Sequence, residues 1–116
     1  MRHRKKGVIL DRKIGPRRAL LKNLAASLIL YEKVKTTEAK AKAIRPYVER
    51  LVTKAKNPTL ANRRILLKLL PTEGPVKKLF EILGPRYQDR RGGYLRITKL
   101  GQRQGDRAKV AIIEFV

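Results

Sequence analysis

The spacing of the apolar residues changes once along the chain, from a helical period to alternation. Between Pro16 and Leu83, apolar side chains recur three or four positions apart, which is the period of one face of an α-helix. From Tyr94 to Lys99, apolar and polar residues alternate, as they do in a half-buried strand. The alternating segments near the end of the chain predict a C-terminal β-hairpin.

Proline and threonine pairs mark where the predicted helices begin and end. Gly15-Pro16 opens the first helix, because a proline at the first helical position already has a helical φ and loses no hydrogen bond there. Thr36-Thr37 offers an N-cap for the second helix, in which Pro46 predicts a kink or a short break. Gly84-Pro85 is expected to end the fourth. We expect helices over about residues 16–30, 37–56, 60–70 and 74–84, and strands over about 31–36, 94–99 and 109–116.

Positive charge dominates the composition. The 116 residues include 30 lysines and arginines against 9 aspartates and glutamates, a formal net charge of +21. At physiological salt the Debye length is about 8 Å, so many of these charges repel one another on so small a surface. The compact state is destabilised unless an anion neutralises them, and a nucleic-acid backbone does so while releasing its condensed counterions. The charge therefore predicts a nucleic-acid-binding protein rather than a merely basic soluble one.

The same sequence argues against catalytic and metal chemistry. It contains no cysteine, which excludes disulfides, thiolate metal ligands and a cysteine nucleophile. The one histidine, His3, has no orienting partner nearby in the sequence, and the carboxylates are scattered. No phosphate-loop, dinucleotide, zinc-finger or hydrolase motif is present, and no apolar run approaches the ~20 residues of a membrane span. We expect a cytosolic protein with no enzymatic activity, cofactor or metal.

The candidate RNA-binding residues fall in three stretches. Residues 1–14 form a basic arm, residues 15–116 are expected to form a single globular RNA-binding domain, and the loop 86–94 combines arginines, glycines and tyrosines. Arginine forks bind phosphates and aromatic rings stack on unpaired bases; alternatively, the arm is a solvated tail and the tyrosines pack on the core. The candidates are Arg2, His3, Arg4, Lys5, Lys6, Arg12, Lys13, Arg17, Arg18, Lys22, Arg86, Tyr87, Arg90, Arg91 and Tyr94.

Two other function classes remain open on the residues alone. A DNA-compacting or transcriptional protein would share the charge, but it usually bends DNA as a dimer, and no dimerisation heptad is evident. An RNA-processing nuclease would need a paired acid and base or a metal cluster, which the scattered carboxylates do not provide.

Five segments, in register along the whole chain, carry a family pattern. They are residues 1–7 (MRHRKKG), 18–25 (RALLKNLA), 36–42 (TTEAKAK) leading into Arg45-Pro46, 84–100 (GPRYQDRRGGYLRITKL) and 111–116 (AIIEFV). Together they resemble the family of the bacterial large-subunit ribosomal protein numbered seventeen. The chain opens directly on the first of these segments, which favours a bacterial protein over an organellar one.

The resemblance implies a fold and a role. The family fold is α/β (α+β) in two layers, with about four helices packed on a small three-stranded mixed sheet in which the first strand joins the C-terminal hairpin. The family binds large-subunit ribosomal RNA near the outer end of the peptide exit tunnel, among neighbouring ribosomal proteins, and supports subunit assembly without enzymatic activity. The resemblance therefore favours ribosomal RNA over DNA and places the protein in the cytoplasm, in the ribosome.

Overall fold

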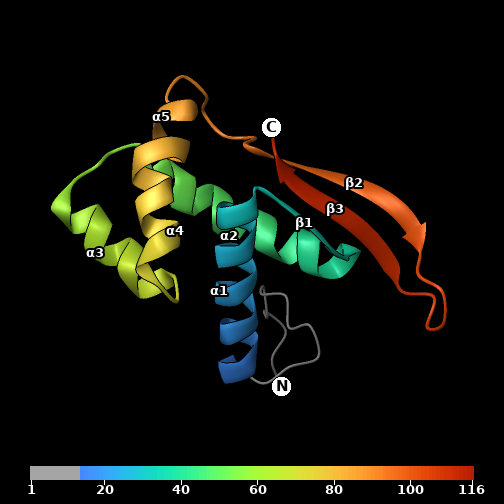
Figure 1. The fold of residues 1–116 in the computed structure, drawn as a ribbon. Coiled ribbons are helices and arrows are strands. Elements are labelled where there is room, and N and C mark those ends of the chain that lie inside the picture. Colours follow the sequence, from blue (N-terminus) through green and yellow to red (C-terminus); the bar gives the residue numbers. More distant parts are fainter. Residues whose placement is uncertain (1–13) are drawn as a thin grey trace, which may run out of the picture.

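The structure, a computed structural model, describes residues 14–116. Helices occupy most of the first two thirds of this part, and an antiparallel sheet lies beside them (Figure 1). The elements in chain order are α1 (Ile14–Tyr31), β1 (Lys33–Thr37), α2 (Glu38–Ala55), α3 (Leu60–Leu69), α4 (Glu73–Lys78), the π-helix η1 (Leu79–Leu83), α5 (Gly84–Arg86), β2 (Leu95–Gln102) and β3 (Lys109–Phe115). Because α4, η1 and α5 follow one another directly, the helical segments make four rods, and the predicted α+β fold with a C-terminal hairpin is confirmed.

The three strands are arranged in the order β1-β3-β2. Glu114, on the central strand, lies opposite Lys33 of β1 on one side and Arg96 of β2 on the other. Both pairings are antiparallel, so the expectation of a mixed sheet was wrong. The reason is that β1 and β2 do run in the same direction, but β3 separates them, and no two parallel strands pair.

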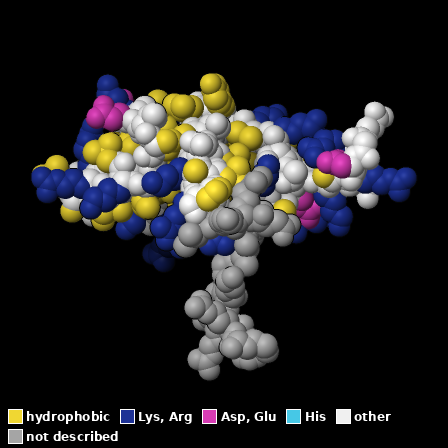
Figure 2. Space-filling view, turned by 90° about the horizontal axis from the view of Figure 1, so that it is seen from below, with side chains coloured by type: hydrophobic (Ala, Val, Ile, Leu, Met, Phe, Trp, Pro, Cys, Tyr) yellow, Lys and Arg dark blue, Asp and Glu magenta, His cyan; other side chains and the backbone are white. Residues whose placement is uncertain are grey.

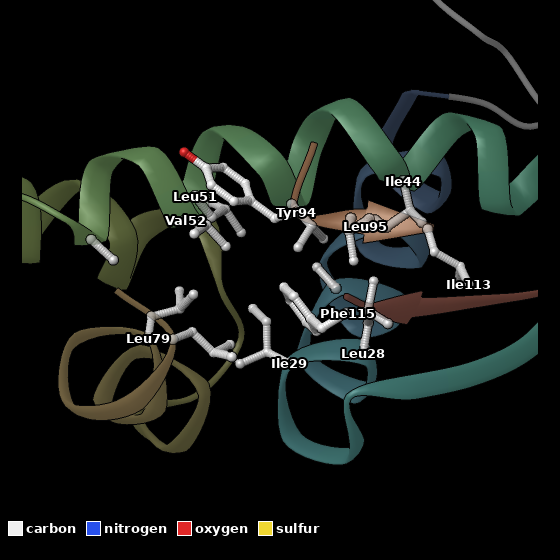
Figure 3. Packing of buried hydrophobic residues seen from close by; sticks show 14 of the residues in the cluster. Leu28, Ile29, Ile44, Leu51, Val52, Leu79, Tyr94, Leu95, Ile113 and Phe115 are labelled. Atoms are coloured by element: carbon white, nitrogen blue, oxygen red, sulfur yellow. The ribbon is translucent and has the colours of Figure 1, made fainter. Parts of the chain in front are cut away.

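Helix α2 lies across the middle of the fold and carries the core. Its apolar residues recur three or four positions apart and are buried together, and none of its cations is buried. In Figure 3, Ile44, Leu51 and Val52 of α2 face Leu28 and Ile29 of α1, Leu79 of η1, and Ile113 and Phe115 of β3. Fully burying one such side chain stabilises the fold by about 1.5–3 kcal/mol. The buried face of α2 consists of Ala41, Ile44, Val48, Leu51, Val52 and Ala55.

Pro46 does not interrupt α2, which is continuous from Glu38 to Ala55, so no short break occurs there. A proline removes the hydrogen bond to the carbonyl four residues earlier. Pro46 and Lys42 are both exposed, and that carbonyl can therefore be solvated. The N-cap prediction is confirmed, since the Thr37 hydroxyl oxygen accepts a hydrogen bond from the Lys40 backbone N–H at 3.3 Å.

Gly84-Pro85 does not end the fourth rod, contrary to the sequence expectation, because helical backbone continues to Arg86. The preceding turn widens into η1, where the Gly84 N–H bonds to the Leu79 carbonyl five residues back. Gly84 is needed for packing, since a Cβ there would lie 2.8 Å from the backbone oxygen of Ala55 on α2. Its missing side chain thus lets the rod and α2 touch backbone to backbone.

Candidate nucleic-acid interface

The acidic residues of the described part are largely engaged within the fold. Lys78 Nζ lies 2.9 Å from the Glu32 carboxylate, which Arg86 also bonds through both of its terminal nitrogens. These hydrogen bonds, first from Arg86 and then from Lys78, lower the pKa of Glu32 to about 2. The ion-paired acids are Glu32, Glu38, Glu49, Asp106 and Glu114. Their charges are therefore fixed beside particular cations.

Many further lysines and arginines in the described range have no acidic partner there and are available to bind a polyanion. No charged residue in the described range is buried, so all of this charge is at the surface. Figure 2 shows lysines and arginines over both ends of the molecule, at the helical end and at the hairpin. The cations without an ion pair inside residues 14–116 are Arg17, Arg18, Lys22, Lys33, Lys35, Lys40, Arg50, Lys54, Lys56, Arg63, Arg64, Lys68, Lys77, Arg90, Arg91, Arg107 and Lys109.

The loop between α5 and β2 is held at its base by two tyrosines. The rings of Tyr87 and Tyr94 are 5.2 Å apart between centroids, and the Tyr94 hydroxyl lies 3.1 Å from Lys56 Nζ and 3.3 Å from the Arg90 carbonyl oxygen. Lys56 Nζ also donates to that carbonyl. Gly93, with φ of +64°, turns the chain into β2. The loop is therefore tied to the core while Arg90 and Arg91 remain exposed.

The two loop tyrosines do not serve as the expected base-stacking surfaces in this conformation. Tyr87 is 5% exposed and Tyr94 is 1% exposed, both within the hydrophobic core. The core alternative that the sequence left open is the one the structure adopts. The reason is the packing of Phe115, whose ring lies 6.1 Å from that of Tyr87 between centroids. These residues shape the loop, and its arginines face solvent.

The remaining candidates differ in their surroundings. Arg18 on α1 is exposed, whereas Arg17 and Lys22 are half-buried. Arg86 is exposed but already bonded to Glu32, so only part of its donor capacity is free. The candidates Arg2, His3, Arg4, Lys5, Lys6, Arg12 and Lys13 lie outside the described residues.

Sequence reasoning missed a basic surface on α3. Arg63, Arg64 and Lys68 are exposed on this helix, of which only Leu66 is buried. The Thr59 hydroxyl caps the helix by accepting from the Asn62 N–H at 3.1 Å. The available signal was the run Asn62-Arg63-Arg64 in the first turn after the Thr59 cap.

A second overlooked region is a hollow beside α2 and α3. It has a volume of about 320 Å³ and is lined by the half-buried ring of Tyr47, by Leu51 and Leu69, and by Arg50 and Lys54. The Tyr47 hydroxyl donates to the Leu69 carbonyl at 2.5 Å, and burial raises the pKa of this tyrosine. Two cations beside an apolar hollow suit an anionic partner. Tyr47, Arg50, Leu51 and Lys54 recur at helical spacing along α2, but local sequence gives no sign that Leu69 meets them.

Comparison with known proteins identifies the family of the chain. A family model described as ribosomal protein L17 matches residues 20–116, which is most of the chain. The chain belongs to this family. Ribosomal protein L17 is a family of ribosomal proteins and not of enzymes, and the family assignment made from the sequence is confirmed.

Relatives of the L17 family match over the full chain, including the residues before position 20. The protein named large ribosomal subunit protein bL17 in Sphingopyxis alaskensis is 53% identical over 100% of this chain and 84% of its own length. The proteins of the same name in Hydrogenobaculum sp. and Thermomicrobium roseum are 53% and 51% identical, over 100% of this chain and 99% of theirs. All three organisms are bacteria.

Two further findings concern the described residues only. None of the L17 helices between Ile14 and Arg86 is long and apolar enough to cross a membrane. Within the same part of the chain, no three histidine or acidic side chains come together in a way that could hold a metal ion.

Proposed function

We propose that the protein is a structural constituent of the large ribosomal subunit that binds large-subunit ribosomal RNA. The observation that carries this proposal is the identity of 53% with a large-subunit protein over the whole chain, in a sequence with a net charge of +21. The relatives' names place those proteins in the large subunit, and the unpaired surface cations give this chain the means to bind its RNA.

Binding would depend on phosphate neutralisation by cations already fixed on folded elements. Arg18 on α1, Arg64 on α3 and Arg91 in the tyrosine-based loop lie on three separate parts of the surface. Because the folded core already holds these groups in place, binding costs little conformational entropy. Cations spread in this way fit the shape of a folded RNA, which is recognised largely by its geometry and its phosphates.

The family resemblance supports a finer role. The protein would hold neighbouring RNA segments together near the exit tunnel, supporting assembly and stability of the subunit beside other ribosomal proteins in the cytoplasm. Residues 1–14 would act as a basic arm joined to the domain of residues 15–116. The arm and the surface cations together would bridge phosphates that repel one another in free RNA.

A salt titration with two competitors tests the proposal. The protein is titrated with the large-subunit ribosomal RNA transcribed from the same genome, against duplex DNA of equal phosphate concentration. A footprint of 6–10 phosphates predicts an affinity that falls by about 10³–10⁵ between 50 and 200 mM salt, with RNA preferred at every salt concentration. A nearly flat salt response contradicts electrostatic binding. A preference for duplex DNA favours the alternative of a DNA-compacting or transcriptional protein.

A further inference from the structure

Tyr31 differs from every other aromatic residue of the chain. The four tyrosines and two phenylalanines all lie in the described part, and there is no tryptophan. Tyr87, Tyr94 and Phe115 are buried, and Tyr47 and Phe80 pack partly against the core. Tyr31 is 75% exposed. It is the aromatic ring that the fold leaves available to a partner.

The backbone on both sides of Tyr31 is held rigidly. The Leu30 carbonyl oxygen accepts a hydrogen bond from Lys78 Nζ at 2.9 Å. Glu32 has a left-handed φ of 62°, which only tertiary contacts make favourable for a glutamate. Its N–H bonds to the Leu28 carbonyl at 2.7 Å, and its carbonyl accepts from the Phe115 N–H at 3.0 Å.

The Glu32 side chain makes further contacts in the same region, the corner of the fold around residues 30–32. Its carboxylate is bonded by Lys78 and by Arg86, two cations from the fourth rod. The end of α1, the start of β1, α4, α5 and the last residues of β3 are thereby tied together. Tyr31 sits at the centre of these ties but takes part in none of them. The fold thus fixes the position of an exposed ring that does not stabilise it through burial.

The residues around Glu32, next to Tyr31 in sequence, carry a net positive charge. Glu32 balances only one of the two charges of Lys78 and Arg86, and Lys33, two residues beyond Tyr31, is exposed without an ion pair inside the described range. An exposed ring next in sequence to Glu32, which two cations bond, and close to Lys33 suits a nucleotide, whose base stacks while the adjoining phosphates meet the charges. An apolar protein surface would leave those cations without partners.

We propose that Tyr31 stacks on an unpaired base of the ribosomal RNA, with Lys33 and Arg86 facing the phosphates on either side of it. This inference rests on the proposed function and names a contact within it. The sequence suggested this stacking role for Tyr87 and Tyr94, but both of those rings are buried in the core. The proposal assigns the role to Tyr31 instead. Because the corner is rigid before binding, little ordering opposes the stack.

Three substitutions at this position separate stacking from other roles. Base–aromatic stacking contributes about 1–3 kcal/mol per base, so Tyr31→Ala should weaken RNA binding by roughly 5- to 150-fold. Tyr31→Phe keeps the ring and should bind within about 2-fold of the unmodified protein. The salt slope should not change in either variant, whereas Lys33→Ala should reduce it by about one. All variants should melt as the unmodified protein does, because the side chain is exposed.

A fluorescent variant gives a direct readout. Since the chain has no tryptophan, Tyr31→Trp introduces a single one, and stacking on a base should quench its emission as ribosomal RNA is added. The matched control is Leu100→Trp, at a position 47% exposed on β2 whose neighbouring cations Lys99 and Arg103 are ion-paired. Its emission should change much less.

The outcomes are distinguishable. Unchanged affinity of Tyr31→Ala for RNA overturns the inference and leaves the ring for a protein neighbour, while the proposed function stands. Equal losses in Tyr31→Phe and Tyr31→Ala also overturn it, because the hydroxyl would then be the binding group. Failure of the unmodified protein to bind the RNA overturns the proposed function and this contact with it.

Discussion

Tyr87 and Tyr94 lie seven residues apart in sequence, with their ring centroids 5.2 Å apart and their planes inclined at 49°. Their hydroxyl groups bond in different directions. Tyr87 donates to the carbonyl of Val116 at 2.7 Å, and the Tyr94 hydroxyl lies 3.2 Å from Thr53 Oγ1 on α2. This pair closes the arginine-bearing loop and joins it to the C-terminus and to helix α2.

Removing one of these hydroxyl groups tests that role. Tyr94→Phe keeps the ring in the core but leaves Lys56 Nζ and Thr53 without a hydroxyl partner. We expect a loss of about 1–2 kcal/mol in the free energy of unfolding, measured by urea denaturation. Tyr31→Phe is the matched control, since Tyr31 makes no comparable contact, and it should change stability by less than about 0.5 kcal/mol. Equal effects in the two variants would show that the Tyr94 hydroxyl does not stabilise the loop.

A second prediction concerns the contact between the fourth rod and α2. Gly84→Ala places a Cβ 2.8 Å from the backbone oxygen of Ala55, and backbone cannot move aside as a flexible side chain can. Overpacking of this kind costs about 1–3 kcal/mol of stability. Gly74→Ala, in α4, meets only Leu30 Cδ2 at 3.9 Å and should be neutral or slightly stabilising. Thermal melts of both variants check the difference, and equal melting temperatures contradict the close contact.

The helices were predictable because their causes are local. The apolar positions of α2, such as Ile44 and Val48, follow one another at helical spacing, and Thr37 caps the helix from the adjacent residue. The burial of Tyr94 was not predictable in this way. It depends on Thr53, 41 residues earlier, and on Lys56, neither of which has any regular spacing from it.

The strand pairing and the charged surface likewise depend on contacts between residues far apart in the sequence. The hairpin of β2 and β3 was predicted from alternation, but the pairing of Lys33 with Glu114 joins opposite ends of the described chain and has no local signal. The composition showed only that basic residues outnumber acidic ones. It did not show which cations remain free, because partners such as Glu32 and Arg86 meet only in the fold.

The Glu32 corner predicts a dependence of stability on pH. The pKa of this group is about 2 in the folded protein against an ordinary 4.5, so its contribution is complete above about pH 5 and is lost as the pH falls towards 2. Because the side chain is 34% exposed, solvent screening limits the effect to about 1 kcal/mol. The free energies of unfolding of Glu32→Gln and of the unmodified protein should therefore converge as the pH approaches 2. A constant difference from pH 7 to 2 would contradict the assigned pairing.

The exposed loop arginines should act through phosphates. Replacing Arg90 and Arg91 together by alanine is expected to reduce the salt slope of RNA binding by about two, with a loss of affinity that is similar for different RNA sequences. The control is Arg103→Ala with Asp106→Ala, which removes an ion pair of the hairpin turn without changing net charge. That variant should keep the slope of the unmodified protein. An unaltered slope in the Arg90 and Arg91 variant would remove this loop from the interface.

Sedimentation tests the central claim most directly. Lysate is resolved on sucrose gradients at low and high salt, and the protein is detected in each fraction. We expect it to travel with the large ribosomal subunit at low salt and to leave it only at high salt, as electrostatic binding to RNA requires. Protein found only in free or nucleoid fractions at low salt would contradict a ribosomal role.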